Sequence, residues 1–274
     1  HPPMAIYSLD GTDLDDVRQR WVLAEGTTLS TRGEPWNASV DIPGRFGVLP
    51  IAPSVLKSAT VALKFTVFSW TDGRNGNRCK EGLEVLERNY QDLLRRLYAF
   101  GRLQTLQYTP KGSPAREAKV RPTSSVEPAF DPHSETITFA ITYEIVSGLW
   151  RGTADIEAPL TDMSAFNGCV MPIPDGKLLL EPTAQPCTVR DNVSGTSLTF
   201  TGALNGGEHL LVDIAKYRAW KNPSSGWEPV SGSRSADGAI SMSPGGFRAT
   251  PNADGRISMT LTNVAGRFRG RMAY

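Results

Sequence analysis

The chain has 274 residues, enough for two domains, and its 39% hydrophobic and 21% charged residues are ordinary for a globular protein with a sizeable core. Its net charge of +1 argues against a protein whose main task is to grip nucleic acid, because such domains carry a concentrated basic surface. No apolar run approaches the roughly 20 residues of a transmembrane helix, so we expect no membrane insertion.

The first half of the chain predicts strands. A short strand is expected at 20–23, and residues 61–70 and 136–146 alternate apolar and polar side chains, which is typical of half-buried strands. Residues 103–108 and 117–121 predict a hairpin. Residues 40–54 are broken by Pro and Gly and are expected to form a structured loop.

One long helix is predicted at 81–100, in contrast to the strands around it. Its apolar residues recur at helical spacing and predict one buried stripe: Leu83, Leu86, Tyr90, Leu93, Leu94 and Leu97. Gly101 is expected to cap the C-terminus. The side chains expected on the opposite, charged face are Glu84, Glu87, Arg88, Asp92, Arg95 and Arg96. A helix of this length needs a sheet or a neighbour to lie against, so we expect it to be docked.

The composition shifts after Trp150, and we place a domain boundary near residue 160. The second half predicts only strands: a hairpin over 198–214 around Asn205-Gly206-Gly207, then strands at 217–220, 256–262 and 267–273. The expected fold class is mainly β, with two β-sandwich-like domains. The first, residues 1–160, carries the helix, and the second, residues 161–274, is an antiparallel sandwich.

Patterns that would indicate catalysis are weak. His133 and His209 have no nucleophile or carboxylate at a suggestive spacing, and we interpret them as surface residues. Cys169 and Cys187 are either paired or reduced and buried, and the reduced state is favoured. No dinucleotide, Walker A or paired-cysteine zinc motif is present, so we expect no cofactor, no metal and no catalytic residue.

Two groups in the second half are candidates for binding. Arg267, Arg269 and Arg271 alternate with Phe268, Gly270 and Met272, which puts three guanidinium groups on one face of a strand. This face is either a charged, edge-protecting surface or a ligand-binding comb. Tyr217, Trp220 and Trp227 either stack against a sugar or pack in the core or at a domain interface.

Taken together, the chain resembles the siphophage distal tail protein (Dit-like) family over nearly its whole length. The resemblance rests on Trp21-Val22-Leu23, IPGRFG (Ile42–Gly47), VALKFTVFSW, the helix running into RLQTLQY, and TFAITYEIVSGLW. In the second half it rests on LTFTGALNGGEHLLVDIAKYRAW, with Asp213 as the acidic residue, and on MSPGGFRATPNADGRISMTL.

The resemblance implies a ring-forming N-terminal β-domain and a galectin-like C-terminal sandwich. It implies a homo-hexamer at the distal end of the phage tail, assembled in the bacterial host cytoplasm. The implied partners are the tail tube protein, the tail hub or tail-associated protein, the tape measure protein and a receptor-binding protein. DNA would pass through without specific binding, and the charged helix face would meet solvent or a neighbouring subunit.

Three alternatives remain open at this point. The second sandwich could recognise host-wall carbohydrate. The chain could be another ring-forming tail protein, such as a tube or hub subunit, although tube proteins are usually one compact domain. It could be a hydrolase, whose weakness is the missing catalytic constellation.

Overall fold

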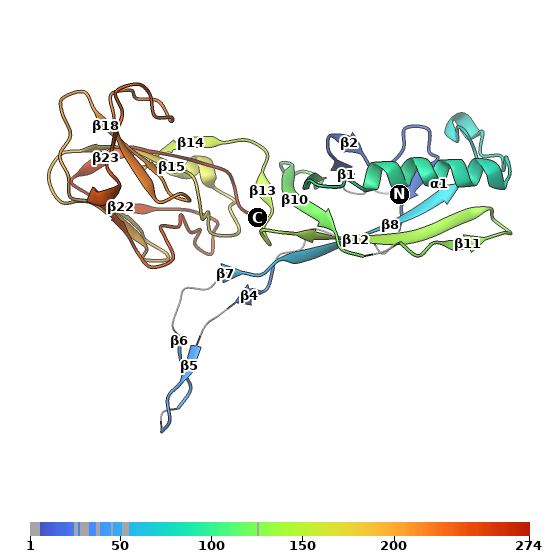
Figure 1. Cartoon of the computed structure of the whole chain (residues 1–274), viewed down its shortest axis with the longest axis horizontal. Helices are drawn as coiled ribbons and strands as arrows, with labels where there is room; N and C mark the ends of the chain where they lie inside the picture. The colour runs from blue at the N-terminus through green and yellow to red at the C-terminus, as the bar shows by residue number, and fades with distance from the viewer. Residues whose placement is uncertain are drawn as a thin grey trace. The chain divides into compact units, whose positions relative to one another are not determined.

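The computed structural model describes residues 6–24, 27, 33–36, 39–44, 46–50, 55–124 and 126–274. The chain divides into two compact units, one of His1–Trp36 and Val55–Arg151, the other of Asn37–Ser54 and Gly152–Tyr274. The predicted fold class, mainly β with one long helix, is confirmed (Figure 1). No helix in the described ranges is long and apolar enough to cross a bilayer.

The first unit is built on one antiparallel sheet with strand order β2-β1-β9-β10-β12-β8-β3. Its strands are β1 (Ile6–Leu9), β2 (Thr12–Asp13), β3 (Trp21–Leu23), β8 (Ala59–Phe68), β9 (Gln104–Thr109), β10 (Arg116–Pro122) and β12 (Thr136–Ile145). Two short strands add to it: β11 (Ala129–Asp131) on β12 and β13 (Arg151–Gly152) on β10. The strands expected at 20–23, 61–70 and 136–146 and the hairpin of 103–108 with 117–121 are confirmed.

Strands β8 and β12 form the centre of this sheet and pair along ten residues, with Phe65 opposite Phe139. Alternate side chains of both strands are buried, because only one face of the sheet is covered. The rings of Phe65 and Phe139 stack with centroids 5.6 Å apart. The face predicted for β12, from Ile137 to Ile145, is the buried one.

Helix α1 (Leu83–Leu97) lies along β8 and β12 (Figure 1). Tyr90 packs edge-on against Phe139 with centroids 5.5 Å apart, and Leu93 is fully buried. Asn89, which the apolar stripe did not include, is buried and donates from Nδ2 to the carbonyl oxygens of Phe68 and Trp70, both at 2.9 Å. The helix is therefore docked by an apolar stripe and by a polar anchor at its centre.

Two details of the helix prediction are wrong. Leu83, placed in the buried stripe, is 56% exposed, because it lies in the first turn, away from the buried residues of the sheet. Gly101 is not the cap: the backbone becomes extended already at Tyr98, with φ −109° and ψ 129°. Gly101 does have a positive φ of 77°, but it turns the chain three residues after the helix has ended.

Residues 40–54, expected to be a loop, contain a two-stranded hairpin of β5 (Ser39–Asp41) and β6 (Val48–Pro50), with Val40 opposite Leu49. The prediction was wrong because Pro and Gly suppress the strand signal of these short segments. Arg45 of the IPGRFG element and residues 51–54 lie outside the described residues. A separate pair is formed by β4 (Pro35–Trp36) and β7 (Val55–Leu56).

Residues 156–270 of the second unit form two antiparallel sheets, as expected for a sandwich. The larger has the order β14-β23-β15-β18-β19-β20, with bounds β14 (Ile156–Pro159), β15 (Lys177–Pro182), β18 (His209–Asp213), β19 (Arg218–Asn222), β20 (Arg234–Ser235) and β23 (Val264–Gly270). The smaller has the order β21-β17-β16-β22, with bounds β16 (Cys187–Asp191), β17 (Ser197–Phe200), β21 (Ile240–Met242) and β22 (Met259–Thr262). Single 3-10 turns are η1 (Arg74–Gly76) in the first unit and η2 (Ser164–Phe166) and η3 (Asp237–Ala239) in the second.

The predicted hairpin over 198–214 is wrong. Its two halves are strands β17 and β18, but they belong to different sheets: β17 pairs with β16 and β21, and β18 with β15 and β19. The segment between them passes from one sheet of the sandwich to the other. Alternation indicates that one face of a strand is buried, and it contains no information about which strand is the neighbour.

The core of the second unit contains Phe166 and Phe268, whose rings lie 5.2 Å apart, and both are fully buried. Cys169 and Cys187 are both buried and are not joined by a disulfide, in agreement with the reduced state favoured from the sequence.

Candidate assembly surface

The charged residues predicted on helix α1 divide into two sets. Glu84, Glu87, Arg88 and Arg95 are exposed and make only local contacts on the helix or at its edge. Arg88 lies 3.8 Å from Glu84, one turn away, and Glu87 accepts a hydrogen bond from Gln91 at 2.8 Å. Such exposed pairs contribute little to stability, so these side chains are available for other contacts.

Asp92, in contrast, connects the helix to the segment before β3. Arg20 donates to both carboxylate oxygens of Asp16, from Nε at 2.7 Å and from Nη2 at 3.0 Å, and its Nη1 reaches Asp92 at 3.1 Å. Burial opposes ionisation of Asp16, but the hydrogen bonds and charge of Arg20 outweigh it and hold the pKa of this carboxyl below its ordinary value. The hydrogen bonds that Arg20 donates to Asp16 also raise the pKa of Arg20.

Trp21 completes this cluster. Its ring is fully buried, and the guanidinium carbons of Arg20 and Arg96 lie 4.5 Å and 5.0 Å from the ring centroid. The indole donates from Nε1 to the carbonyl of Leu14 at 3.0 Å. Asp92 and Arg96 are therefore engaged within the chain, through contacts with residues more than 70 positions away that spacing on the helix does not reveal.

The turn that follows the helix exposes apolar side chains. Phe100 is 93% exposed and Leu103 is 43% exposed, and the Tyr98 ring stacks on Phe100 with centroids 6.4 Å apart. These residues line a hollow of about 560 Å³ together with Arg121 and Pro122. We call Tyr98–Leu103 the post-helix turn. This turn was not predicted from the sequence. It could have been recognised from the apolar residues after Leu97, which no longer follow the helical spacing.

The sheet of the first unit has one open face. The side chains between the buried ones on β8 and β12 are half-buried or exposed, and most are Thr or Ala: Thr60, Ala62, Lys64, Thr66, Thr138, Ala140, Thr142 and Glu144. Arg121 of β10 donates to Glu144 at 2.6 Å. This face presents little net charge.

The arginine-rich strand of the second unit is paired within the chain. Arg267 lies 3.7 Å from Glu157, and Arg269 lies 3.6 Å from Asp155 and 3.7 Å from Glu157 on the neighbouring segment. Strand β23 ends at Gly270, so Arg271 is not part of it, and its Nε donates to the carbonyl of Gly152 at 2.6 Å. The three guanidinium groups do not form one continuous face of a strand.

The described parts of the chain do not meet the requirements of a metal centre. They contain no group of three or more His, Cys, Asp or Glu side chains placed to hold a metal ion. His209 lies 3.1 Å from Glu181 on the second unit, and His133, in the first, is exposed in a turn.

Comparison with known proteins gives a match at the level of fold. No protein-family model matches the chain, and no curated protein matches it by sequence. Among solved structures, the Dit protein of phage SPP1, a paradigm of the hub adsorption apparatus in phages that infect Gram-positive bacteria, is similar with a TM-score of 0.52 and 12% identity. The match covers 98% of this chain and 100% of the Dit chain.

Chains of the phage p2 baseplate in its activated conformation are also similar, with TM-scores of 0.42 and 0.40 and 12% identity, over 99% of this chain and 98% of theirs. The SPP1 match shows that this chain has the Dit fold from end to end. The likeness to distal tail proteins inferred from the sequence is thus confirmed in the fold.

Proposed function

We propose that this protein is a structural component of the tail tip of a long, non-contractile phage tail, where six copies form a ring. The observation that carries the proposal is the end-to-end match to SPP1 Dit: both units are present, in the same order, and neither chain has a large part without a counterpart. The role is non-enzymatic.

The first unit would close the ring. A cyclic ring repeats one heterologous contact around its axis, so each copy needs two different surfaces that fit each other. The exposed helix face and the post-helix turn form one such surface, because Phe100 and Leu103 supply apolar area and Arg88, Arg95 and the two glutamates supply charges of both signs. A contact of about 800 Å² per partner is the usual size for a stable interface.

The proposed partners follow from the position at the tail tip. The ring would join the tail tube protein to the hub or tail-associated protein and to receptor-binding proteins, and it would lie near the tape measure protein. The chain's net charge of +1 and its open, Thr-rich sheet face are compatible with a conduit through which DNA moves without specific binding.

The contact surface can be tested by light scattering on the purified full chain across a concentration series. The wild type is expected to reach six times the chain mass of 29.8 kDa. Phe100→Ser is expected to shift the equilibrium strongly towards a monomer that is still folded, because an exposed side chain contributes little to the fold of the single chain.

Val170→Ser provides a matched control, because Val170 is 51% exposed and belongs to the second unit, whereas the proposed contact is made by residues of the first. It should assemble as the wild type does. Equal assembly of the wild type and the Phe100 variant would contradict the contact surface assigned here.

A further inference from the structure

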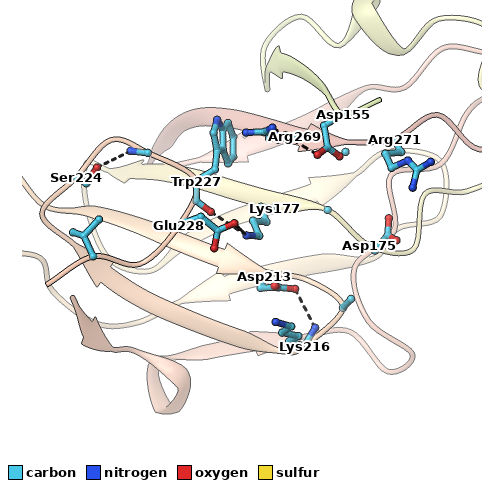
Figure 2. A pocket seen from close by; sticks show the side chains of 15 residues that line it. Asp155, Asp175, Lys177, Asp213, Lys216, Ser224, Trp227, Glu228, Arg269 and Arg271 are labelled. Carbon is cyan, nitrogen blue, oxygen red and sulfur yellow. Dashed lines mark hydrogen bonds and ion pairs between the residues drawn. The ribbon is translucent and has the colours of Figure 1, made fainter. Parts of the chain in front are cut away.

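The second unit contains a polar pocket of about 550 Å³ (Figure 2). Residues from five separate segments line it: Asp155, the start of β15 with Lys177, the end of β18 and the turn after it with Asp213 and Lys216, the loop after β19 with Trp227 and Glu228, and the end of β23 with Arg269. Its size is within the usual range for small-molecule sites.

The loop that carries Trp227 is held in place by a buried amide. Asn222 is fully buried and lies at the end of β19. Its Oδ1 accepts hydrogen bonds from Ser224 N at 3.2 Å and Ser233 Oγ at 3.0 Å, and its Nδ2 donates to the carbonyl of Glu228 at 3.1 Å. One side chain thus fixes the loop on both sides of Trp227, so the backbone that carries the indole is positioned before any ligand arrives.

Lys177 holds the same loop through two further hydrogen bonds. Its Nζ donates to the carbonyl of Trp227 at 3.0 Å and to Glu228 Oε1 at 2.6 Å, and its side chain is 24% exposed. The hydrogen bond from Lys177 lowers the pKa of Glu228, which keeps this carboxylate charged and able to accept. Trp227 itself is half-buried, so part of its ring remains accessible.

Charges of both signs line the pocket in equal number. The cationic residues are Lys177, Lys216, Arg269 and Arg271, and the acidic ones are Asp155, Asp175, Asp213 and Glu228. A phosphate-rich or nucleic-acid ligand needs a positive surface, and an apolar ligand would leave these groups desolvated and unsatisfied. A neutral ligand whose groups both donate and accept hydrogen bonds suits such a lining.

Asp213 is placed to accept from a ligand. It is 9% exposed, and its Oδ1 accepts from Lys216 N at 3.2 Å. Within the described residues no hydrogen bond reaches its Oδ2. In Figure 2, Asp213 and Lys216 lie on one side of Lys177, and Trp227 and Arg269 lie on the other. Acceptors, donors and an aromatic ring therefore surround the pocket.

We propose that this pocket binds a neutral saccharide unit, with the sugar's C–H face against Trp227 and its hydroxyl groups bonded to Asp213, Glu228 and the neighbouring cations. Of the three aromatic residues considered from the sequence, only Trp227 lines the pocket. Trp220 stacks under Arg218 at 5.0 Å, and the Tyr217 hydroxyl accepts from Met242 N at 2.9 Å. The inference concerns the second unit alone and does not depend on ring formation.

Isothermal titration calorimetry on the full chain tests the proposal, with glucose, galactose, rhamnose and N-acetylglucosamine as probes at up to tens of millimolar. We expect at least one of them to bind, and Trp227→Ala to weaken that binding by about tenfold or more, as removal of a central aromatic contact usually does. Asp213→Asn, which keeps the acceptor for Lys216 N, should also weaken it.

Tyr217→Ala is the matched control, because Tyr217 is an aromatic residue of the same unit, 47% exposed and outside the pocket. It should bind as the wild type does. Binding of none of the four sugars overturns the proposal, as does binding that both pocket variants retain in full. Preferential binding of glycerol phosphate or alanine, run as parallel arms, would also overturn it in favour of a charged ligand.

Discussion

Helix α1 of the first unit and strand β23 of the second both present arginines next to a buried apolar face. The carboxylates that face these arginines come from the helix itself in one case and from the neighbouring segment in the other. On β23 the register places Arg267 and Arg269 beside Glu157 and Asp155 of the neighbouring segment, so the charges are paired within the unit. On α1 the outer charges are paired with residues one turn away, and Phe100 in the post-helix turn is open to solvent. The arginines of β23 therefore belong to an internally paired surface of the second unit, whereas those on the outer face of α1 belong to a candidate contact surface of the first.

The largest effect on stability is expected when a substitution on the buried face of β23 is compared with one on its charged face. Phe268 is fully buried against Phe166, so Phe268→Ala should lower the free energy of unfolding of the second unit by about 3–5 kcal/mol through lost burial and a cavity. Arg267→Ala, on the other face, should change it by less than about 1 kcal/mol. Urea denaturation of the two variants measures both values, and equal losses would show that the charges hold the strand.

A smaller effect is expected at the polar anchor of α1. Asn89→Ala removes two hydrogen bonds and leaves the carbonyls of Phe68 and Trp70 without their donor, at a cost of about 1–3 kcal/mol in the first unit. Gln91→Ala, two residues on and exposed, serves as the control and should lie within about 0.5 kcal/mol of the wild type. If Asn89→Ala left the free energy of unfolding unchanged, the apolar stripe alone would be what docks the helix.

The pH dependence of the first unit provides a third test. The pKa of Asp16 is lower in the folded than in the unfolded chain, where it is near the ordinary 3.8. Its contribution is therefore complete above that value and is lost as the pH falls through the folded pKa. Asp16→Asn should lower stability by about 1–3 kcal/mol at neutral pH, and the difference from the wild type should shrink below about pH 4.

That measurement takes the form of urea midpoints for both proteins at neutral pH and at several acid values. A difference that stays constant down to pH 2 would contradict the assigned role of the Asp16–Arg20 pair.

The smallest effect concerns the ion pairs of β23. Arg269→Ala should cost less than about 1 kcal/mol, and the loss should diminish in molar salt, because all the partners are more than a third exposed. A larger loss that does not depend on salt would indicate that these guanidinium groups contribute more to stability than their exposure predicts.

The sequence predicts the regular elements well where burial has a clear period. Strands β8 and β12 and the stripe of α1 follow from alternation and helical spacing, because one face of each is buried against one layer. Asn89 was missed because a polar residue in an apolar face is identified only by the carbonyls that it meets. The hairpin predicted over 198–214 was wrong for a similar reason. Contacts across the whole sandwich, and not the local alternation, determine which strands pair.

The candidate surfaces were predicted only in part, because their residues meet through contacts distant in the chain. Asp92 was predicted to belong to the charged outer face of α1. Its hydrogen bond from Arg20 shows that it belongs to the cluster that Trp21 completes. Trp227 was considered as an aromatic residue, but its pocket draws on five segments that no spacing connects.

Negative-stain electron microscopy of the purified full chain tests the central claim most directly. The proposal predicts closed rings with six-fold symmetry and a central hole, formed by the wild type and by Val170→Ser and lost in Phe100→Ser. Particles without rotational symmetry at high protein concentration, or rings that form equally well in the Phe100 variant, would contradict it.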